Sequence, residues 1–581
     1  MAPRIVVIGT GPAGVRAAQA LADAGLRPTV IDEGSRDGGQ IYRRQPSGFT
    51  RSYETLYGSE AKKASALHQC FDALRQQDRI DYLPDTLVWN IAPGMLYLAG
   101  GTRYSTRPFD ALIVCSGATD RLMPVLGWDL AGAYSLGGAQ VALKSQGCAI
   151  GRRTVLMGTG PLLYLVAAQY TQAGAQIAAV LDTSTSLQRL RALPGLLAVP
   201  AALGKGAALI ALLRRAGVPI HRGVTPRAIH GSAEHGVTGV AVTLRDGRAF
   251  EVACDAVGMG YHLRPETQLA DLAGCTFAFD AAVQQWLPEI DTDGRSSVPG
   301  VYLAGDGARV RGADAAEASG RLAALAVLLD RSASGTAGTA ATGMTATGTA
   351  ATAGGTGGST AGGTGGGTAG GKAIDVAALT AQAVVLRRDL ARLGRFAAGL
   401  RTAFPWPSAL AATLPDAAVV CRCEAITAGE LRRVVRETGA REANRAKAFS
   451  RVGMGRCQGR FCAHAGAEII AAEARVPLAT VGRLRGQAPV RPLPMALAVE
   501  TETGTDVADA ARVAAANGVA DIESAGTVDG VDATEGVDAA DDAGLAGSTG
   551  TAGGASGQHA HADGMAVARA TAIVTPPEPR A

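Results

Sequence analysis

Two glycine-rich turns, each between a strand pattern and a helix pattern, constrain the fold of this chain more than any other feature. The first turn carries the glycines of a G-x-G-x-x-G pattern, Gly9, Gly11 and Gly14. A β-branched apolar run at residues 4–8 precedes it and a helical pattern at residues 15–24 follows. The next strand pattern ends in Asp32, followed by Glu33, where a carboxylate is needed to hold a ribose hydroxyl. Glycines let the backbone approach a pyrophosphate at the helix N-terminus, so this unit is predicted to bind a dinucleotide.

The second turn repeats the first. Gly158 and Gly160 follow an apolar run, a helical stretch comes next, and the following strand pattern ends in Asp182. A carboxylate at that position favours a free ribose hydroxyl over a phosphate, which disfavours NADP. Leu163 replaces the third glycine, so the packing of helix on strand must differ there. Three alternatives stay open: NAD used in redox chemistry, another adenine nucleotide that never reacts, or a domain retained only for packing.

Two stretches have compositions that cannot offset the entropy of ordering. Residues 331–372 are almost entirely Gly, Thr, Ala and Ser, and are predicted to be a flexible linker between modules that fold independently. Residues 500–563 are rich in Ala, Gly and Asp, and are predicted to be a solvated acidic tail. The predicted divisions are a first nucleotide-binding domain in two parts (1–135 and 271–330), a second nucleotide-binding domain (136–270), the linker (331–372), a helical connector (373–418), a cysteine module (419–485) and a mostly disordered tail (486–581).

Charge and hydropathy exclude several classes of function. A formal net charge of +4 on 581 residues gives no reason to expect a nucleic acid partner. The apolar N-terminal run leads directly into a glycine turn and not into a cleavage site, so no export signal is expected. No transmembrane segment is predicted either. We expect a cytoplasmic protein. Any association with the inner membrane would be peripheral and through its electron acceptor.

Four of the nine cysteines are clustered, and their spacing suggests a metal centre. Cys421 and Cys423 form a C-x-C pair, and Cys457 and Cys462 form a C-x4-C pair. Four thiolates also suit tetrahedral zinc, but zinc ribbons usually use C-x2-C pairs, whereas two irons that each need two thiolates fit these spacings. Nearby arginines, which include Arg460, are expected to lower the thiol pKa values. The segment resembles the bacterioferritin-associated-ferredoxin-like (BFD-like) [2Fe-2S] domain over residues 419–476.

Further motifs in residues 4–326 resemble the two-dinucleotide-domain flavoproteins. They are a buried run ending near Gly117, a second run ending in Asp306, and the segment that contains Gly39 and Gln40. The resemblance implies that the first site binds FAD, that Asp306 holds the ribityl chain, and that the segment at Gly39 wraps the flavin. The predicted fold class is therefore an α/β, Rossmann-type flavoprotein with a small helical [2Fe-2S] domain.

The complete order of motifs is similar to the family that contains the A subunits of opine oxidases, the B subunits of hydrogen cyanide synthases and a related component of D-hydroxyproline dehydrogenases. That resemblance implies an electron-transfer subunit that works with a D-amino-acid-oxidase-like flavoprotein subunit; a small ferredoxin-like subunit is a further candidate partner. The small-molecule amine would be oxidised by the partner. No acid-base or nucleophilic constellation for substrate chemistry is evident in this chain. The alternative hypothesis is a stand-alone NADH-dependent reductase of a ferredoxin-like acceptor.

Overall fold

The computed structural model describes residues 3–46, 48, 51–101, 103–343, 375–494, 498–499 and 571–572. Every element discussed below lies in one compact unit, formed by residues 1–498 and 570–581. The predicted acidic tail at residues 500–563 lies outside the described residues.

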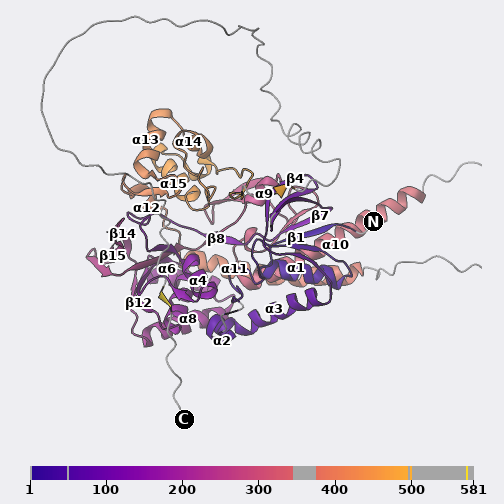
Figure 1. Cartoon of the computed structure of the whole chain (residues 1–581), viewed down its shortest axis with the longest axis horizontal. Coiled ribbons are helices and arrows are strands. Elements are labelled where there is room, and N and C mark those ends of the chain that lie inside the picture. The colour runs from indigo at the N-terminus through magenta and orange to yellow at the C-terminus, as the bar shows by residue number, and fades with distance from the viewer. Residues whose placement is uncertain are drawn as a thin grey trace, which may run out of the picture. The chain divides into compact units, whose positions relative to one another are not determined.

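The first dinucleotide-binding domain is built on a parallel five-stranded sheet. Its order is β21 (Val301–Leu303), β7 (Ala111–Val114), β1 (Ile5–Ile8), β2 (Thr29–Ile31) and β3 (Asp81–Leu83). The packed helices are α1 (Pro12–Asp23), α3 (Ala61–Gln76) and α10 (Ala313–Gly343). An antiparallel meander of β4 (Thr86–Ala92), β5 (Met95–Gly100) and β6 (Arg103–Pro108) inserts before β7. Because β21 comes from the return segment, the chain leaves this domain after β7 and closes it only after building the second domain (Figure 1).

The second dinucleotide-binding domain has its own parallel sheet. Its order is β13 (Ile220–Arg222), β12 (Gln176–Asp182), β11 (Arg153–Thr159), β17 (Ala256–Tyr261) and β9 (Ala133–Ser135). Three helices follow strands of this sheet or lie beside it: α4 (Leu136–Ser145), α5 (Pro161–Gln172) and α8 (Pro200–Arg215). A separate antiparallel sheet extends the domain and consists of β14 (Thr225–Ser232), β15 (Gly236–Thr243) and β16 (Ala249–Ala253). The two passages between the domains pair as a small antiparallel ribbon, β8 (Ala118–Asp120) with β18 (Leu263–Pro265).

The cysteine module is a group of short helices, α13 to α15 in Figure 1. Its elements are α12 (Ala409–Thr413), β22 (Val419–Cys421), β23 (Ile426–Thr427), α13 (Ala428–Thr438), α14 (Ala443–Ser450), α15 (Ala463–Ala474) and α16 (Leu478–Val481). Helix α13 begins with a capping box: the Thr427 hydroxyl accepts from the backbone N–H of Glu430, and the Glu430 carboxylate accepts from the backbone N–H of Thr427.

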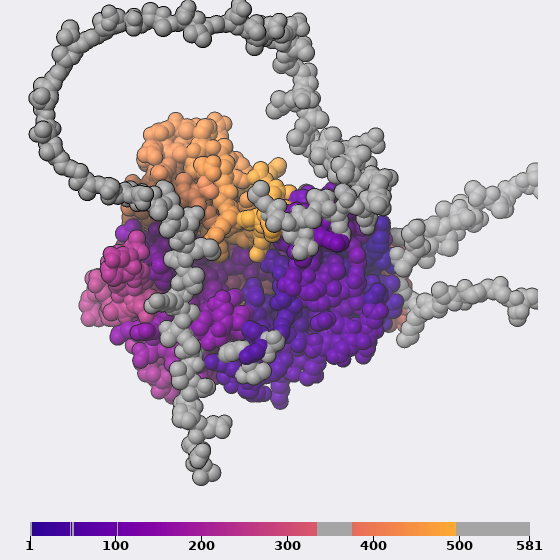
Figure 2. All heavy atoms as spheres, viewed as in Figure 1, coloured from indigo at the N-terminus to yellow at the C-terminus, as the bar shows by residue number. Residues whose placement is uncertain are grey.

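The cysteine module does not pack as a separate body. Val420, Leu431 and Ile469 of the module belong to the same buried apolar cluster as Val257 and Met259 of the second domain. In Figure 2 the orange atoms of the module adjoin the purple and magenta atoms of that domain. This shared core counts against the expectation that the modules fold independently. A segment of under 100 residues buries too small a fraction of its surface to form a large core alone.

The predicted start of the linker falls inside an observed helix. Helix α10 runs to Gly343, so residues 331–343 of the predicted linker are helical, whereas residues 344–374 lie outside the described residues. The predicted helical connector is α11 (Val376–Ala403), which begins with an Asp375 side chain that accepts from the N–H of Ala378. Residues 486–494 of the predicted tail lie against the first domain, where Tyr104 donates its hydroxyl to the carbonyl of Pro494. Within the described ranges, no helix has the length and apolarity that a membrane crossing requires.

Candidate redox centres

The first glycine turn has the geometry of a phosphate-binding site. Gly9 has φ +96°, and a Cβ there would lie 2.4 Å from the carbonyl oxygen of Cys115. A Cβ on Gly14 would lie 1.7 Å from the carbonyl oxygen of Gly9, so only glycine lets α1 start this close to the strand. The helix begins at Pro12 after Gly11, with no side-chain cap, which leaves its first-turn N–H groups for an anion. The residues present fit a dinucleotide pyrophosphate.

The two acidic residues after β2 have different surroundings. Asp32 accepts hydrogen bonds from the N–H and hydroxyl of Thr10, at 2.5 and 2.6 Å, and from the N–H of Gly34 at 2.7 Å. These bonds fix the half-buried carboxylate at the mouth of the turn, where a ribose would lie. Glu33 is exposed and forms an ion pair with Arg491 at 2.7 Å. Asp32 is therefore the better placed of the two predicted ribose ligands.

The other predicted flavin-binding residues surround the same turn. The backbone of Gly39 lies close to Gly11, because a Cβ on Gly39 would be 2.8 Å from the Cα of Gly11. The side chain of the next residue, Gln40, is exposed. Gly117 follows β7 and Asp306 follows β21, which lies next to β7 in the same sheet as β1. Asp306 accepts from the N–H of Arg311 at 2.9 Å, and burial raises its pKa. The structure thus brings the predicted residues of the first site to one edge of one sheet.

The second glycine turn is covered by another part of the same chain. Gly160 has φ +112°, and the ring of His262 lies 3.4 Å from where its Cβ would be. The backbone carbonyl of Phe404, just after α11, is hydrogen-bonded to Nε2 of His262, and the Phe404 ring lies 6.2 Å from the His262 ring. The same ring lies 6.5 Å from Tyr164 on α5. Leu163, at the third-glycine position, is fully buried in the core between α5 and the sheet.

The carboxylate of Asp182 is hydrogen-bonded to residues of its own domain. This carboxylate has no exposed surface, and it accepts hydrogen bonds from Thr159 at 3.0 Å, Tyr164 at 2.6 Å and the N–H of Ser184 at 2.8 Å. Arg189 also forms an ion pair with it. The predicted position of this carboxylate at the end of β12 is correct, but a ribose hydroxyl would have to displace one of these partners. The second site therefore differs from the first, whose carboxylate faces an open turn.

The four predicted cysteines line one chamber of about 280 Å³. No three His, Cys, Asp or Glu side chains of the described residues converge as the ligands of a single metal ion would. All four thiols line the same chamber, and two irons would need two thiolates each. Cys421 and Cys462 are buried, whereas Cys423 is exposed. The donor set and the space fit a binuclear cluster better than tetrahedral zinc.

Hydrogen bonds among the thiols and from the backbone favour thiolates in this chamber. Hydrogen bonding with the side chain of Cys462 lowers the pKa of Cys421 to about 6 and that of Cys457 to about 5, and the same interactions raise the pKa of Cys462 well above the ordinary value. Backbone N–H groups add to this effect, including those of Gly453 on Cys421 and Gly459 on Cys457. Of the nearby arginines, Arg460 turns toward Glu266, whereas Arg422 interacts electrostatically with Cys423, and Arg264 with Cys457 and Cys462.

The second nucleotide-binding domain supplies the opposite wall of the chamber. Leu122, Trp128, Tyr134, Ser135 and Met259 line it together with the cysteines. The indole N–H of Trp128 donates to the carbonyl of Val419, two residues before Cys421, and the guanidinium of Arg422 lies 5.1 Å over the indole ring. These residues carry no local motif, so nothing in the sequence identified them.

A buried ion pair joins the cysteine loop to the first domain. Arg460, between Cys457 and Cys462, pairs with Glu266 at 2.7 Å, and the two side chains are 10% and 9% exposed. The N–H of Glu266 donates to the carbonyl of Gly117, one of the predicted flavin-binding residues, at 3.0 Å. One chain of hydrogen bonds therefore runs from the predicted flavin turn to the predicted cluster loop.

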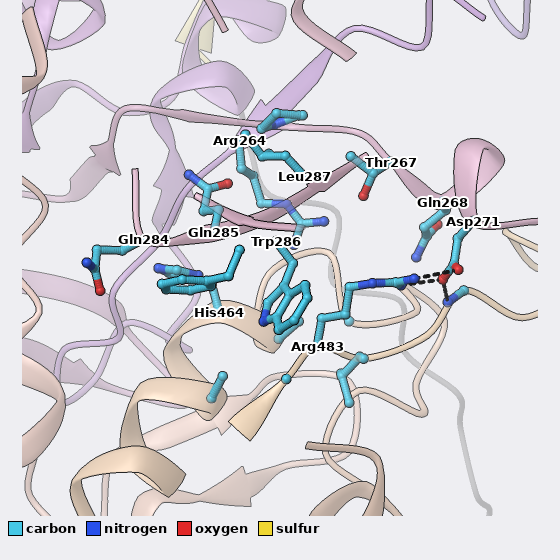
Figure 3. A pocket seen from close by; sticks show the side chains of 18 of the residues that line it. Arg264, Thr267, Gln268, Asp271, Gln284, Gln285, Trp286, Leu287, His464 and Arg483 are labelled. Carbon is cyan, nitrogen blue, oxygen red and sulfur yellow. Dashed lines mark hydrogen bonds and ion pairs between the residues drawn. The ribbon is translucent and has the colours of Figure 1, made fainter. Parts of the chain in front are cut away.

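A second, smaller cavity of about 90 Å³ lies between the module and the hairpin of β19 (Phe277–Asp280) and β20 (Gln285–Pro288) (Figure 3). At the edge of this cavity Arg483 forms a bidentate ion pair with Asp271, in which Nη2 lies 2.7 Å from Oδ1. His464 contacts the buried Arg121 and lies 3.2 Å from Glu468. These contacts fix the module against the first domain.

Two dinucleotide-binding sheets, an open phosphate turn and a four-cysteine chamber define an α/β, Rossmann-type oxidoreductase with an added iron–sulfur binding domain, which confirms the predicted fold class. The chain belongs to the pyridine nucleotide-disulphide oxidoreductase family, whose model matches residues 3–320, and it carries a BFD-like [2Fe-2S] binding domain at residues 419–472. Within that family it is a member of the group formed by the A subunits of opine oxidases and the HcnB subunits of hydrogen cyanide synthases.

Three curated relatives match most of this chain over most of their own length. The A subunit of opine oxidase from Rhizobium meliloti is 34% identical over 85% of this chain and 86% of its own. The subunit of the same name from Agrobacterium tumefaciens (strain Ach5) is 35% identical, with 85% and 90% covered, and HcnB of Pseudomonas aeruginosa is 30% identical, with 84% and 97% covered. The solved L-proline dehydrogenase of P. horikoshii has a TM-score of 0.55 over 86% of this chain and 80% of that one, at 15% identity, which shows a shared fold.

Proposed function

We propose that this chain is the electron-relaying subunit of a complex that oxidises an amine or amino acid, such as an opine, D-hydroxyproline or a glycine-like substrate. A D-amino-acid-oxidase-like partner subunit would oxidise the C–N bond. The observation that carries the proposal is the hydrogen-bonded connection of Gly117, Glu266 and Arg460, which joins the first nucleotide turn to the loop between Cys457 and Cys462. The relatives named above as opine oxidase and hydrogen cyanide synthase subunits support it.

Each part of the chain has a proposed role. The residues proposed to hold FAD are Gly9, Gly11, Gly14, Asp32, Glu33, Gly39, Gln40, Gly117 and Asp306. Cys421, Cys423, Cys457 and Cys462 would hold a [2Fe-2S] cluster. FAD supplies two-electron chemistry and a [2Fe-2S] centre one-electron transfer, so a chain that holds both can pass an electron pair on as single electrons. The core shared with the second domain excludes water from the side of the chamber where Cys421 and Cys462 are buried.

The stand-alone NADH reductase is the competing function. Gly158, Gly160 and Asp182 favour a nucleotide at the second site, NAD or another adenine nucleotide. The carboxylate of Asp182 already accepts hydrogen bonds within its own domain, and Phe404 covers the glycine turn. Both observations count against NADH as a hydride donor. We propose that any nucleotide bound there stabilises the fold and does not react.

Co-expression of the chain with a D-amino-acid-oxidase-like subunit tests the two functions. The complex should reduce a dye with one substrate of a panel of opines, D-hydroxyproline and glycine, and NADH should not replace that substrate. Dye reduction by the isolated chain with NADH at a similar rate would contradict the relay proposal and support the reductase.

A further inference from the structure

The cysteine chamber opens onto an exposed surface of unusual composition. Cys423 is exposed, and four exposed side chains surround it: Arg422, Met454, Arg456 and Phe461. We call these five residues the cluster face. They come from two loops, yet they are adjacent in space. A Cβ on Gly455 would lie 2.2 Å from Cβ of Cys423, so the loop that carries Met454 and Arg456 touches the other cysteine pair.

The centre of the cluster face is apolar. Met454 and Phe461 are 37% and 38% exposed, and Phe461 also lines the chamber beside Cys423. An exposed apolar centre beside a redox-active thiol set is typical of an interaction site, because apolar side chains that serve only the core are buried.

The rim of the cluster face is basic. Residues 419–485 contain 13 Lys or Arg and 6 Asp or Glu, although the whole chain contains 55 against 51, so the basic excess is concentrated in this module. The nearest acid, Glu424, is neutralised by Arg451 at 2.8 Å. Arg456 has no ion-pair partner among the described residues. Unpaired basic charge at the rim attracts an acidic surface and orients its approach.

We propose that the cluster face is the docking site of a redox protein that presents carboxylates around an apolar centre. This inference rests on the proposed relay function and names the kind of partner that exchanges single electrons with this chain. The exposed ligand Cys423 lies at the centre of the contact, which makes the distance for electron transfer short.

The test uses two probe proteins of opposite charge and the full-length chain. Acidic flavodoxin in its anionic hydroquinone form gives one electron to the oxidised cluster and becomes the neutral semiquinone, with no proton released. Basic ferricytochrome c takes one electron from the cluster after dithionite has reduced it. Stopped-flow rates with flavodoxin should fall about tenfold between roughly 0.02 and 0.3 M salt, whereas rates with cytochrome c should start low and rise.

Charge reversal locates the contact. Arg456→Glu should lower the low-salt rate with flavodoxin about tenfold and remove most of its salt dependence. Arg456→Gln should have a smaller effect of the same sign. The matched control is Arg475→Glu, an exposed arginine at the far end of α15, about 18 Å from Cys462 along the helix. Its rates should match those of the unmodified chain. The EPR spectrum of the reduced cluster should be the same in all variants.

Three results would overturn the inference. Equal losses with Arg456→Glu and Arg475→Glu would mean that only the net charge matters. A flavodoxin rate that rises with salt would mean that acidic residues, such as those of the segment 500–563 of this chain, already occupy the face. A faster low-salt reaction with cytochrome c would mean that the partner is basic. A cluster that dithionite cannot reduce is a different failure, since it contradicts the proposed relay itself.

Discussion

Glu266 and Arg460 form a buried ion pair at 2.7 Å between the strand that returns to the first domain and the loop between Cys457 and Cys462. The guanidinium of Arg460 also donates to the carbonyls of Cys457 at 3.3 Å and Val490 at 2.8 Å. Three separate segments therefore meet at one arginine. Because the partners are almost inaccessible to water, each depends on the other to offset its desolvation.

Replacement of Glu266 by Gln should destabilise the protein. The change leaves Arg460 buried without a counter-charge, so the free energy of unfolding should fall by about 3 kcal/mol, measured by urea denaturation. The cluster EPR spectrum should also change, because Arg460 holds the carbonyl of Cys457. Glu473→Gln removes a more exposed pair with Arg436 and should cost under about 1 kcal/mol. Equal costs for the two variants would show that the buried pair is not important for stability.

Replacement of Cys421 or Cys457 by Ser should abolish the visible absorbance of the cluster and leave FAD bound. Serine oxygen is a poor ligand for iron that prefers thiolate, while the first nucleotide site uses none of the four cysteines. Absorbance, EPR and released FAD should be measured on the same sample, with Cys70→Ser as the control outside the chamber. Loss of FAD together with the cluster in both variants would show that the first site depends on the chamber.

The isolated cysteine module should not fold. Residues 373–485 expressed alone would lack the part of their buried apolar cluster that the second domain supplies, which includes Val257 and Met259. We expect aggregation, or a species that lacks a cooperative thermal transition, and no bound cluster. A monomer with a cluster EPR signal and a sharp transition would mean that the shared core contributes little.

NADH should not reduce the flavin of the native chain within seconds of mixing, as followed by stopped-flow absorbance. Phe404→Ala removes the ring over Tyr164 and His262 and should tighten the binding of ADP-ribose about tenfold. Phe396→Ala, on α11 but without those ring contacts, is the matched control. Rapid flavin bleaching in the native chain would contradict the relay proposal.

Lys144 should make stability depend on pH above neutrality. Its side chain is buried, the ammonium donates to the carbonyl of Ile41 at 2.8 Å, and burial, reinforced by Arg43, lowers its pKa to about 7. Between about pH 7 and the ordinary lysine pKa, the unfolded state binds more protons than the folded one. Stability should therefore rise with pH in that window, by at most about 1.4 kcal/mol per pH unit. Lys144→Met should flatten the rise, and an unchanged slope in urea denaturation from about pH 7 to 10 would refute this.

The amino-acid sequence by itself determined the local units of this protein. Glycine spacing and apolar runs specify β1, α1 and their repeat, because a turn without Cβ atoms at Gly9 and Gly14 is a local steric requirement. The capping box at Thr427 and the end of β12 at Asp182 are equally local, and both are where the pattern predicts them. The cysteine spacings, C-x-C and C-x4-C, likewise indicated one chamber before its walls were known.

Only the tertiary structure decided how those units meet. Trp128 lies 293 residues before Cys421, and Glu266 lies 194 residues before Arg460, so no local pattern could link them. The same is true of Phe404 over the second glycine turn. Long-range packing also counts against the expectation of independent modules, because the apolar surface of a small helical segment is buried most favourably against the neighbouring sheet.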